Sequence, residues 1–286
     1  MLKCVFRVHF HRLVLKSFTI SLVTAALLCQ NVQAAKARVE HVVVVVWDGM
    51  RPDFVKPEYT PVLCQLASNG VFFAAHHPVY VSSTEVNGAA LATGDYPNHS
   101  GIIANREYRP EINWLEPCAT ESVDTIRRGD ELSGGHYLFN PTVAETVQRA
   151  GFATAVAGSK PVALFQDRSL THSPGSSAAV LYNGHTIPSA LLPAVAQSNG
   201  KDFPTNTTPN MGRDVWTTKG LTEVLWKKGV PRFSLLWLSE PDASQHLDSP
   251  GSTNAIAGIA SNDRNLAVVL EALEQKGVRQ STERQR

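Results

Sequence analysis

The stretch VVVVVWDGMRPD, Val42 to Asp53, combines a strand signal with an acidic residue at its end. Five valines in succession favour a β-strand, because β-branched side chains are stiff and fit a pleated sheet. Their lack of polar alternation is typical of a strand covered on both faces, as in the parallel sheets of α/β proteins. Asp48 then lies at the carboxyl end of the strand, the edge of such a sheet where ligands bind. Asp-Gly is also a dipeptide that commonly begins turns. Asp48-Gly49 therefore fits either a ligand-binding position or an ordinary turn, and the rest of the chain must distinguish the two interpretations.

The first 34 residues of the 286-residue chain have the order of a secretory signal peptide. Basic residues without any acid come first, an uncharged and mostly apolar run follows at 17–28, and Val32 and Ala34 stand at a small-residue cleavage position. The apolar run is shorter than the about 20 residues of a membrane span. We therefore expect residues 1–34 to direct export to the periplasm or the cell exterior, and we expect no stable membrane span.

The remaining chain is slightly acidic and poor in cysteine. Without the four bases of the leader, 22 Lys and Arg face 25 acidic residues, a net charge of −3. No basic stripe supports nucleic-acid binding. Cys64 and Cys118 are too few for a disulfide scaffold or a cysteine-ligated zinc site, and they either form one disulfide or remain thiols. The sequence does not indicate an oligomeric state.

Strand and helix signals alternate along the chain, which predicts an α/β fold with a mainly parallel sheet flanked by helices. Helices are expected at 60–70, 142–151, 214–229 with an interruption at Gly220, and 262–277. Further strands are expected at 71–79, 152–158 and 232–242. The stretches 104–140 and 160–210 are rich in Gly, Pro, Ser, Asn and Thr and are expected to be long excursions above the sheet.

A second apolar strand also ends on an acid. In LLWLSEPDASQH, Asp242 follows the strand and His246 comes four residues later. That spacing places both side chains on one side of a helical turn, and both residue types bind zinc. Alone, this pair of residues is as compatible with a structural role as with zinc binding.

The stretch YVSSTEVNGAALATG predicts a helix start that can bind an anion. Ser82 and Glu85 have the spacing of a capping box, which places Thr84 in the first turn and Asn87 on the same face. A hydroxyl, the amides of the helix start and a side-chain amide would converge there, as a phosphoryl group requires. The alternative is an ordinary cap on an alanine-rich helix.

Together these segments resemble the alkaline phosphatase superfamily, and within it the threonine-nucleophile branch of type I phosphodiesterases and nucleotide pyrophosphatases. The resemblance rests on five segments in order between about residues 40 and 276: WDGMRPD, TPVLCQLASNGVFF, SSTEVNGAALATGDYPNHSGI, Asn105 and EPDASQH. It implies an alkaline-phosphatase-like fold. Residues 35–286 would be the N-terminal part of one hydrolase domain, incomplete at its C-terminus.

The resemblance also implies roles for individual residues. Thr84 would be the nucleophile and a ligand of the metal that Asp48 holds, and a phosphothreonine intermediate would form. Asn87 would bind a phosphoryl oxygen. Asp242 and His246 would hold a second metal, so that two divalent ions, expected to be zinc, clamp a small phosphorylated substrate for in-line displacement.

Some residues depart from the family pattern and bear on the substrate. The aromatic residue and the proline usual after the nucleophile are replaced by Glu85 and Val86. Lys160 stands where phosphomonoesterases of this branch bind the extra phosphate charge, but Val162 occupies the position of their arginine, and Arg168 is out of register. A phosphodiester or pyrophosphate substrate is therefore expected, with a phosphomonoester as the alternative.

The C-terminal end of the chain departs most from the family pattern. After Gly277 the family continues with a strand and an Asp-His-Gly segment that supplies further metal ligands, whereas this sequence reads VRQSTERQR. Truncation, a frameshift and a non-catalytic remnant with a phosphate cradle all remain open. With only part of the metal site, the chain is expected to have little or no hydrolytic activity.

Overall fold

The computed structural model describes residues 39–169 and 177–278. Apart from Val39, they belong to one compact unit, which spans Glu40–Arg286. The expected signal peptide at 1–34 lies outside the described residues. No helix in the described ranges is both long and apolar enough to cross a membrane.

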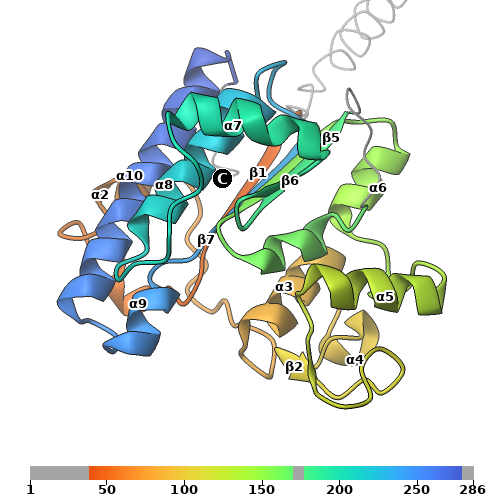
Figure 1. The fold of residues 1–286 in the computed structure, drawn as a ribbon. Coiled ribbons are helices and arrows are strands. Elements are labelled where there is room, and N and C mark those ends of the chain that lie inside the picture. The colour runs from red at the N-terminus through yellow and green to blue at the C-terminus, as the bar shows by residue number, and fades with distance from the viewer. Residues whose placement is uncertain (1–38, 170–176, 279–286) are drawn as a thin grey trace, which may run out of the picture. The chain divides into compact units, whose positions relative to one another are not determined.

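A five-stranded sheet with the order β1-β7-β4-β5-β6 lies at the centre of this unit (Figure 1). Its strands are β1 (Val42–Trp47), β4 (Thr154–Gly158), β5 (Ala178–Tyr182), β6 (His185–Ile187) and β7 (Phe233–Leu238). The first four strands in the spatial order are parallel, and β6 pairs antiparallel with β5. The α/β class and the mainly parallel sheet predicted from the sequence are confirmed.

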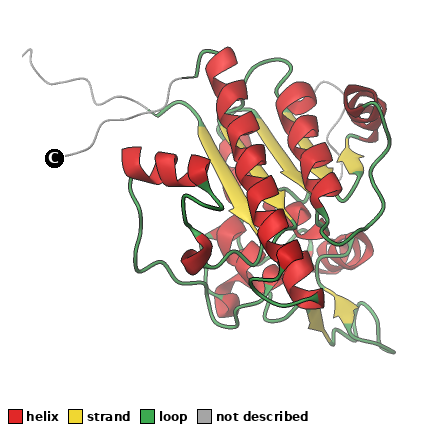
Figure 2. Ribbon diagram, turned by 90° about the vertical axis from the view of Figure 1, so that its left-hand side faces the viewer, coloured by secondary structure: helices red, strands yellow, loops and turns green. Residues whose placement is uncertain are grey.

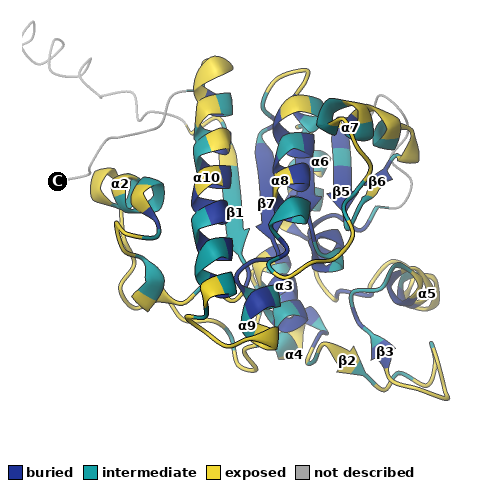
Figure 3. Cartoon of the chain, turned by 60° about the vertical axis from the view of Figure 1, so that its left-hand side comes forward, coloured by how far each residue is buried: buried dark blue, intermediate teal, exposed yellow. Residues whose placement is uncertain are grey.

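Helices cover both faces of the sheet (Figure 2). One face carries α7 (Leu192–Asn199), α8 (Met211–Lys219), the π-helical η4 (Gly220–Leu225) and α10 (Thr253–Gln275). The other carries α3 (Thr84–Thr93), α5 (Val123–Ser133), α6 (Val143–Arg149) and the 3-10 helix η2 (Pro161–Gln166). β7, β4 and β5 are buried between these layers, while the helices expose their outer sides (Figure 3).

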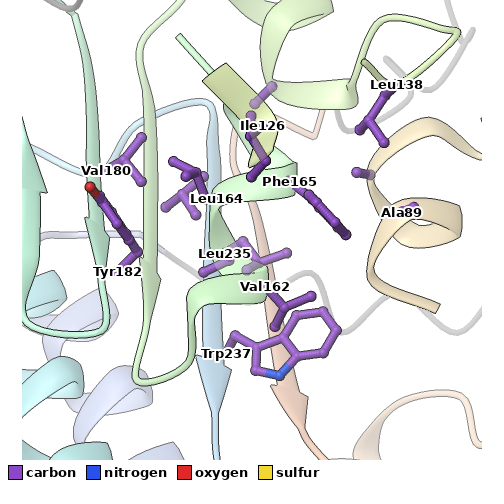
Figure 4. Packing of buried hydrophobic residues seen from close by; sticks show 14 of the residues in the cluster. Ala89, Ile126, Leu138, Val162, Leu164, Phe165, Val180, Tyr182, Leu235 and Trp237 are labelled. Carbon is purple, nitrogen blue, oxygen red and sulfur yellow. The ribbon is translucent and has the colours of Figure 1, made fainter. Parts of the chain in front are cut away.

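The core consists of two apolar clusters, one on each face of the sheet. In the first, Trp237 and Leu235 of β7 lie beside Val162 and Phe165 of η2, with Ala89 of α3 nearby (Figure 4). The second is built around fully buried tryptophans from α8 and the end of η4, packed on the opposite face of β7. Alternate residues of a strand point to opposite faces, so one strand serves both clusters.

The valine-rich strand β1 lies at the edge of the sheet and is only partly buried. Its side chains alternate between the two clusters, as predicted for a strand with apolar cover on both faces. A cavity of about 400 Å³ remains between β1, α10 and α2 (Pro61–Asn69), and another of about 300 Å³ lies on the opposite face. Along one of its edges, β1 has no neighbouring strand among the described residues. Its side chains are therefore only partly covered, and Val42 is 47% exposed.

The helices expected from the sequence are present, with some shifted boundaries. α2 ends at Gly70, α6 has the Thr142–Glu145 capping box, and α8 gives way to η4 at Gly220. α10 begins well before residue 262, because Ser252 caps it by accepting a hydrogen bond from the N–H of Ala255.

The strand predicted at 71–79 is wrong. The segment lies outside the sheet, and Phe72 and Phe73 are 59% and 76% exposed. Its apolar run at 71–75 is exposed throughout, so no other element covers it. Of the two alternatives that the sequence leaves open for the cysteines, the structure has free thiols at both Cys64 and Cys118.

The two stretches expected as irregular excursions contain short regular elements. Residues 104–140 include α5 and an antiparallel pair of two-residue strands, and residues 160–210 include η2, β5, β6 and α7. The remaining elements are η1 (Pro52–Phe54), α4 (Pro97–Ser100), β2 (Arg106–Glu107), β3 (Cys118–Ala119), η3 (Ser189–Leu191) and α9 (Asp242–Leu247).

Candidate active site

The two strand ends that carry acids meet at one edge of the sheet. β1 and β7 are parallel with Trp47 opposite Leu238, and the N–H of Asp48 continues the ladder by donating to Leu238 O at 3.0 Å. The N–H of Asp242, the first residue of α9, donates to Asp48 O at 3.0 Å. Gly49 makes this contact feasible, because it has φ +70° and a Cβ there would lie 2.8 Å from Asp242 Cα. Asp48 and Asp242, each predicted to follow the end of a strand, lie together at the carboxyl edge of the sheet.

Lys160 lies between the two carboxylates. It follows β4, the other neighbour of β7, and its Nζ is 2.7 Å from Asp48 Oδ2 and 2.9 Å from Asp242 Oδ2. Burial opposes the charged ammonium, but the two aspartates together outweigh it and raise the pKa of Lys160 above its usual range. Burial raises the pKa of Asp48, an effect that Lys160 only partly offsets. Lys160 therefore serves as a counter-cation for both acids.

Thr84 begins α3 and faces Asp48. Its Oγ1 donates a hydrogen bond to Asp48 Oδ1 at 3.5 Å. The predicted capping box is wrong by one residue, since the N-cap of α3 is Ser83 and its side chain accepts no hydrogen bond from the helix. Thr84 is consequently the first residue of the helix, where the positive end of the helix dipole lies.

The side chain of Asn87 is engaged with the loop before α3. Its Oδ1 accepts from the N–H of Val79 at 2.9 Å, and its Nδ2 donates to the carbonyls of Ser83 and Val81 at 3.0 and 3.4 Å. In this arrangement the amide of Asn87 holds the loop in front of Thr84.

His246 lies on the solvent side of the same region. Its Nε2 is 3.3 Å from Asp242 Oδ1, and its side chain is 79% exposed. The spacing of four residues along α9 brings the two side chains together, as the sequence predicts.

A second pair of acids, Glu85 and Glu121, was not predicted as part of the site. Glu85 follows Thr84 in α3 and is 6% exposed, and Glu121 comes from the loop between β3 and α5. The Oε2 atoms of both glutamates are buried and have no hydrogen-bond partner among the described residues. Burial, followed by the charge of Glu85, raises the pKa of Glu121 to about 8, and burial also raises the pKa of Glu85. The only advance signal was that Glu85 replaces the aromatic residue expected after the nucleophile.

A buried carboxylate behind the site fixes the loops that carry Lys160 and Asp242. Asp214 of α8 is fully buried and accepts hydrogen bonds from Ser159 Oγ at 2.5 Å, Ser239 N at 2.7 Å and Glu240 N at 3.0 Å. Burial raises the pKa of Asp214 to about 6. Nothing in the sequence around Asp214 distinguishes it from an ordinary polar residue of a helix.

Val162 and Arg168, the two positions considered for binding an additional phosphate charge, do not supply a free cation. Val162 is fully buried, and a Cβ on Gly88 would lie 2.4 Å from its Cγ2. Arg168 forms ion pairs with Asp130 at 2.5 Å and with Glu145 at 3.3 Å. Neither residue places a guanidinium beside Lys160.

The residues at this edge suit a divalent cation in their chemistry. The Lys160 ammonium is itself a cation held by Asp48 and Asp242, so the two carboxylates form a seat for positive charge. Carboxylates and an imidazole are zinc ligands, and Thr84 Oγ1 adds an oxygen. Within residues 39–169 and 177–278, no three Asp, Glu, His or Cys side chains converge closely enough to hold an ion.

Comparison with known proteins agrees with this arrangement. The family described as "Type I phosphodiesterase / nucleotide pyrophosphatase" matches residues 42–283. The chain belongs to the type I phosphodiesterase/nucleotide pyrophosphatase family. The match includes Asp48, Thr84, Lys160 and Asp242, and it identifies the chain as a member of a hydrolase family.

Curated relatives of the family are distant and much longer. Venom phosphodiesterase 2 of Crotalus adamanteus is 24% identical over 237 residues, which are 81% of this chain and 23% of the relative. Ectonucleotide pyrophosphatase/phosphodiesterase family member 1 of Mus musculus is 22% identical over 238 residues, 81% of this chain and 22% of the relative. The chain therefore spans less than a quarter of these relatives.

Solved structures share the fold. Phosphonoacetate hydrolase from Sinorhizobium meliloti 1021 has a TM-score of 0.61 at 19% identity, covering 82% of this chain and 54% of that one. Murine ectonucleotide pyrophosphatase/phosphodiesterase 5 has a TM-score of 0.58 at 21% identity, covering 84% and 54%. The chain spans about half the length of these two structures.

Proposed function

We propose that the chain carries the phosphoryl-transfer centre of a metal-dependent hydrolase that acts on phosphodiester or pyrophosphate bonds. The observation that carries the proposal is the 3.5 Å contact of the Thr84 hydroxyl with Asp48, beside Asp242 and Lys160. A nucleophile, a seat for cations and the start of a helix thereby meet at one point, which is what the chemistry of phosphate esters requires.

Thr84 would act as the nucleophile. Its Oγ1 forms a bond to phosphorus, the bond from phosphorus to the leaving oxygen breaks, and the hydroxyl proton has Asp48 Oδ1 as its existing acceptor. The product is a phosphorylated Thr84 that keeps the remaining ester group of the substrate, which water then hydrolyses. Asp48 and Asp242 would hold divalent ions, with Thr84 and His246 as further donors. Bound there, the ions would supply Lewis-acid stabilisation of the phosphoryl oxygens.

A diester or pyrophosphate substrate is favoured over a phosphomonoester. A monoester brings one more negative charge, which a second cation beside Lys160 would have to balance. Val162 lies in the apolar core and Arg168 is paired with two acids, so neither supplies that cation. The two aspartates that contact Lys160 further disfavour a more highly charged substrate.

A second candidate function is a binding module that holds a phosphate ester without turnover. It is favoured by the absence, within the described ranges, of three metal-ligating side chains around one point. Two protein ligands hold an ion more weakly than the three usual for catalytic zinc. Slow turnover is therefore part of the proposal for this chain.

The first turnover distinguishes the two functions. The chain is mixed with excess zinc and bis(p-nitrophenyl) phosphate, and nitrophenolate release is followed from the first seconds. We expect a burst of up to one nitrophenolate per chain, retained in part by Thr84→Ser and lost in Thr84→Ala. A burst that survives in Thr84→Ala contradicts the assignment of the nucleophile, and binding of the diester without a burst supports the binding module.

Export is proposed on the sequence of residues 1–34. Expression in a bacterial host with N-terminal sequencing of the mature chain tests it, and cleavage close to Ala34 or Ala35 is expected. A mature chain that begins at Met1 in the cytoplasmic fraction would contradict export.

A further inference from the structure

The outer edge of β1 presents backbone groups with which no strand of the described residues pairs. On the inner edge, the N–H groups of Val42 and Asp48 donate to carbonyls of the segment that contains β7. Backbone groups alternate in direction along a strand, so the N–H and C=O groups of Val43 and Val45 point to the outer edge. Such an edge offers donors and acceptors to a further strand.

An apolar groove lies on each face of this edge. The cavity of about 400 Å³ runs along Val43, Val45 and Trp47, with leucines of α2 and α10 opposite them. The cavity of about 300 Å³ on the other face runs along Val42 and Val44 and is bordered by residues of α3 and α6. Successive side chains of a strand point to opposite faces, so a strand added beside β1 would place its side chains in the two grooves alternately.

Helix α2 covers the position beside β1 on one face. Leu63 and Leu66 of α2 line the larger groove, and α2 lies on the outer side of α10, away from α8 (Figure 3). Asp263 of α10 is buried and fixes the start of α2 by accepting hydrogen bonds from the N–H groups of Val62 and Leu63 at 3.0 and 2.9 Å. A second copy of the chain would bring its own α10 and α2 into the same space. The position therefore suits a single strand without a helical layer of its own.

The charge at this edge is confined to one end. Arg232, at the amino end of β1, lines the smaller groove, and no other ionisable residue lines either groove. Its guanidinium donates to Glu40 O at 2.9 Å and lies over the ring of Phe152, and it forms no ion pair with an acid of the described residues. The grooves thus favour an uncharged apolar segment, and Arg232 favours an acidic residue at the end of that segment.

We propose that the outer edge of β1 is the docking site for one extended segment of another polypeptide. The segment pairs with Val43 and Val45 through main-chain hydrogen bonds, places apolar side chains in both grooves and carries an acidic residue beside Arg232. An acyl chain would fill a groove but leave the main-chain groups of the edge without partners. The proposal is independent of the proposed hydrolase activity, because it uses none of the residues of the candidate active site.

The test uses a fluorescent peptide of alternating valine and isoleucine, as long as the six residues of β1, with an aspartate at each end. Methyl groups on alternate backbone nitrogens leave it one edge that can pair, so that it does not stack on itself. Fluorescence polarisation measures its binding to the full chain. We expect saturable binding, and we expect a peptide that is methylated on every nitrogen to bind at least about tenfold more weakly.

Variants of the chain locate the peptide. Leu66→Trp fills the larger groove and should weaken binding about tenfold, and Leu270→Trp replaces it if that variant fails to fold by thermal unfolding. Leu132→Trp, at a position of α5 that is 46% exposed, is the matched control and should leave binding unchanged. Arg232→Met should weaken the aspartate peptide about two- to fivefold and leave a peptide with asparagine ends unaffected.

Hydrogen exchange, followed by NMR, should slow at the N–H groups of Val43 and Val45 when the peptide binds. Equal binding of the fully methylated peptide would mean that the grooves accept any apolar ligand, and it would overturn strand docking. A dimer in sedimentation velocity that Leu66→Trp dissociates would assign the edge to a second copy and overturn the proposal. A wild-type chain that shows no saturable binding of the peptide would overturn it as well.

Discussion

Two pairs of acids, Asp48 with Asp242 and Glu85 with Glu121, differ in what accompanies their charge. Asp48 and Asp242 share the ammonium of Lys160 at 2.7 and 2.9 Å. Glu85 and Glu121 each have a buried Oε2 atom without a hydrogen-bond partner among the described residues. Opposite charge stabilises the first pair, whereas burial raises the pKa of both glutamates and favours their protonated form.

The aspartate pair thus binds a cation, whereas the glutamate pair has raised pKa values that favour its protonated form. The aspartates stay charged because a cation is present, and they are ready to exchange it for another cation. Burial raises the pKa of both glutamates, so it favours their protonated form. Each of the following changes acts on one of the two pairs.

The largest expected effect is on zinc binding by the aspartate pair. Asp48→Asn should weaken zinc binding by at least about 100-fold, because it removes a charged ligand from a site with few protein ligands. Glu85→Gln should weaken it far less, since Glu85 is not a ligand. Equilibrium dialysis with elemental analysis measures both, and equal losses in the two variants would remove the distinction between the pairs.

Removing the lysine should destabilise the metal-free chain. Lys160→Met leaves Asp48 buried beside Asp242 without a counter-cation, which should lower the free energy of unfolding by about 3 kcal/mol. Urea denaturation in the presence of a chelator measures the loss, and added zinc should restore stability. Lys219→Met is the matched control, because that lysine is 41% exposed and should cost less than about 0.5 kcal/mol. A loss that zinc fails to reverse would argue against a shared cation seat.

The glutamate pair should give the stability a pH dependence. The pKa of Glu121 is raised from 4.5 to about 8 in the folded chain, so between these values the folded state keeps a proton that the unfolded state releases. Stability therefore falls as the pH rises through this window and levels off above it. Glu121→Gln should remove about 1–2 kcal/mol of that fall, as measured by urea denaturation between pH about 5 and 8.5. An unchanged profile in Glu121→Gln would show that the pair holds no proton.

The smallest expected effect concerns the close contact between the backbone at Gly49 and Asp242. Gly49→Ala places a Cβ 2.8 Å from Asp242 Cα at φ +70°, whereas Gly134→Ala at φ +66° meets no atom within 4 Å. Both substitutions carry the backbone penalty, so Gly49→Ala should cost about 1 kcal/mol more than Gly134→Ala. Thermal unfolding compares the two, and equal costs would mean that the contact between Gly49 and Asp242 is not a constraint.

The sequence predicts the aspartate pair well and the glutamate pair poorly, for a physical reason. Asp48 and Asp242 each follow an apolar strand directly, and the carboxyl ends of parallel strands meet at one sheet edge. Glu121 lies in the loop between β3 and α5, whose path depends on tertiary contacts. No local pattern in the sequence encodes that path.

The fold shows the same division between local and tertiary signals. The valine run predicts β1 correctly, but the position of β1 at the edge of the sheet follows from strand order. Capping rules locate α3 but choose Ser82 where Ser83 is the cap, since they fix a helix end only to within one or two residues. The prediction of a strand at 71–79 fails because this apolar run lies outside the sheet, a tertiary outcome that the local pattern does not encode.

The central claim is that Thr84 is the nucleophile beside a seat for cations, and its most direct test is the identity of the modified residue. The chain is incubated with zinc and bis(p-nitrophenyl) phosphate, quenched in acid during the burst, and digested for tandem mass spectrometry. We expect a nitrophenyl phosphate ester on Thr84, absent from Thr84→Ala and from Asp48→Asn. An ester on another residue, or an unmodified Thr84 in a chain that releases nitrophenolate, would contradict the claim.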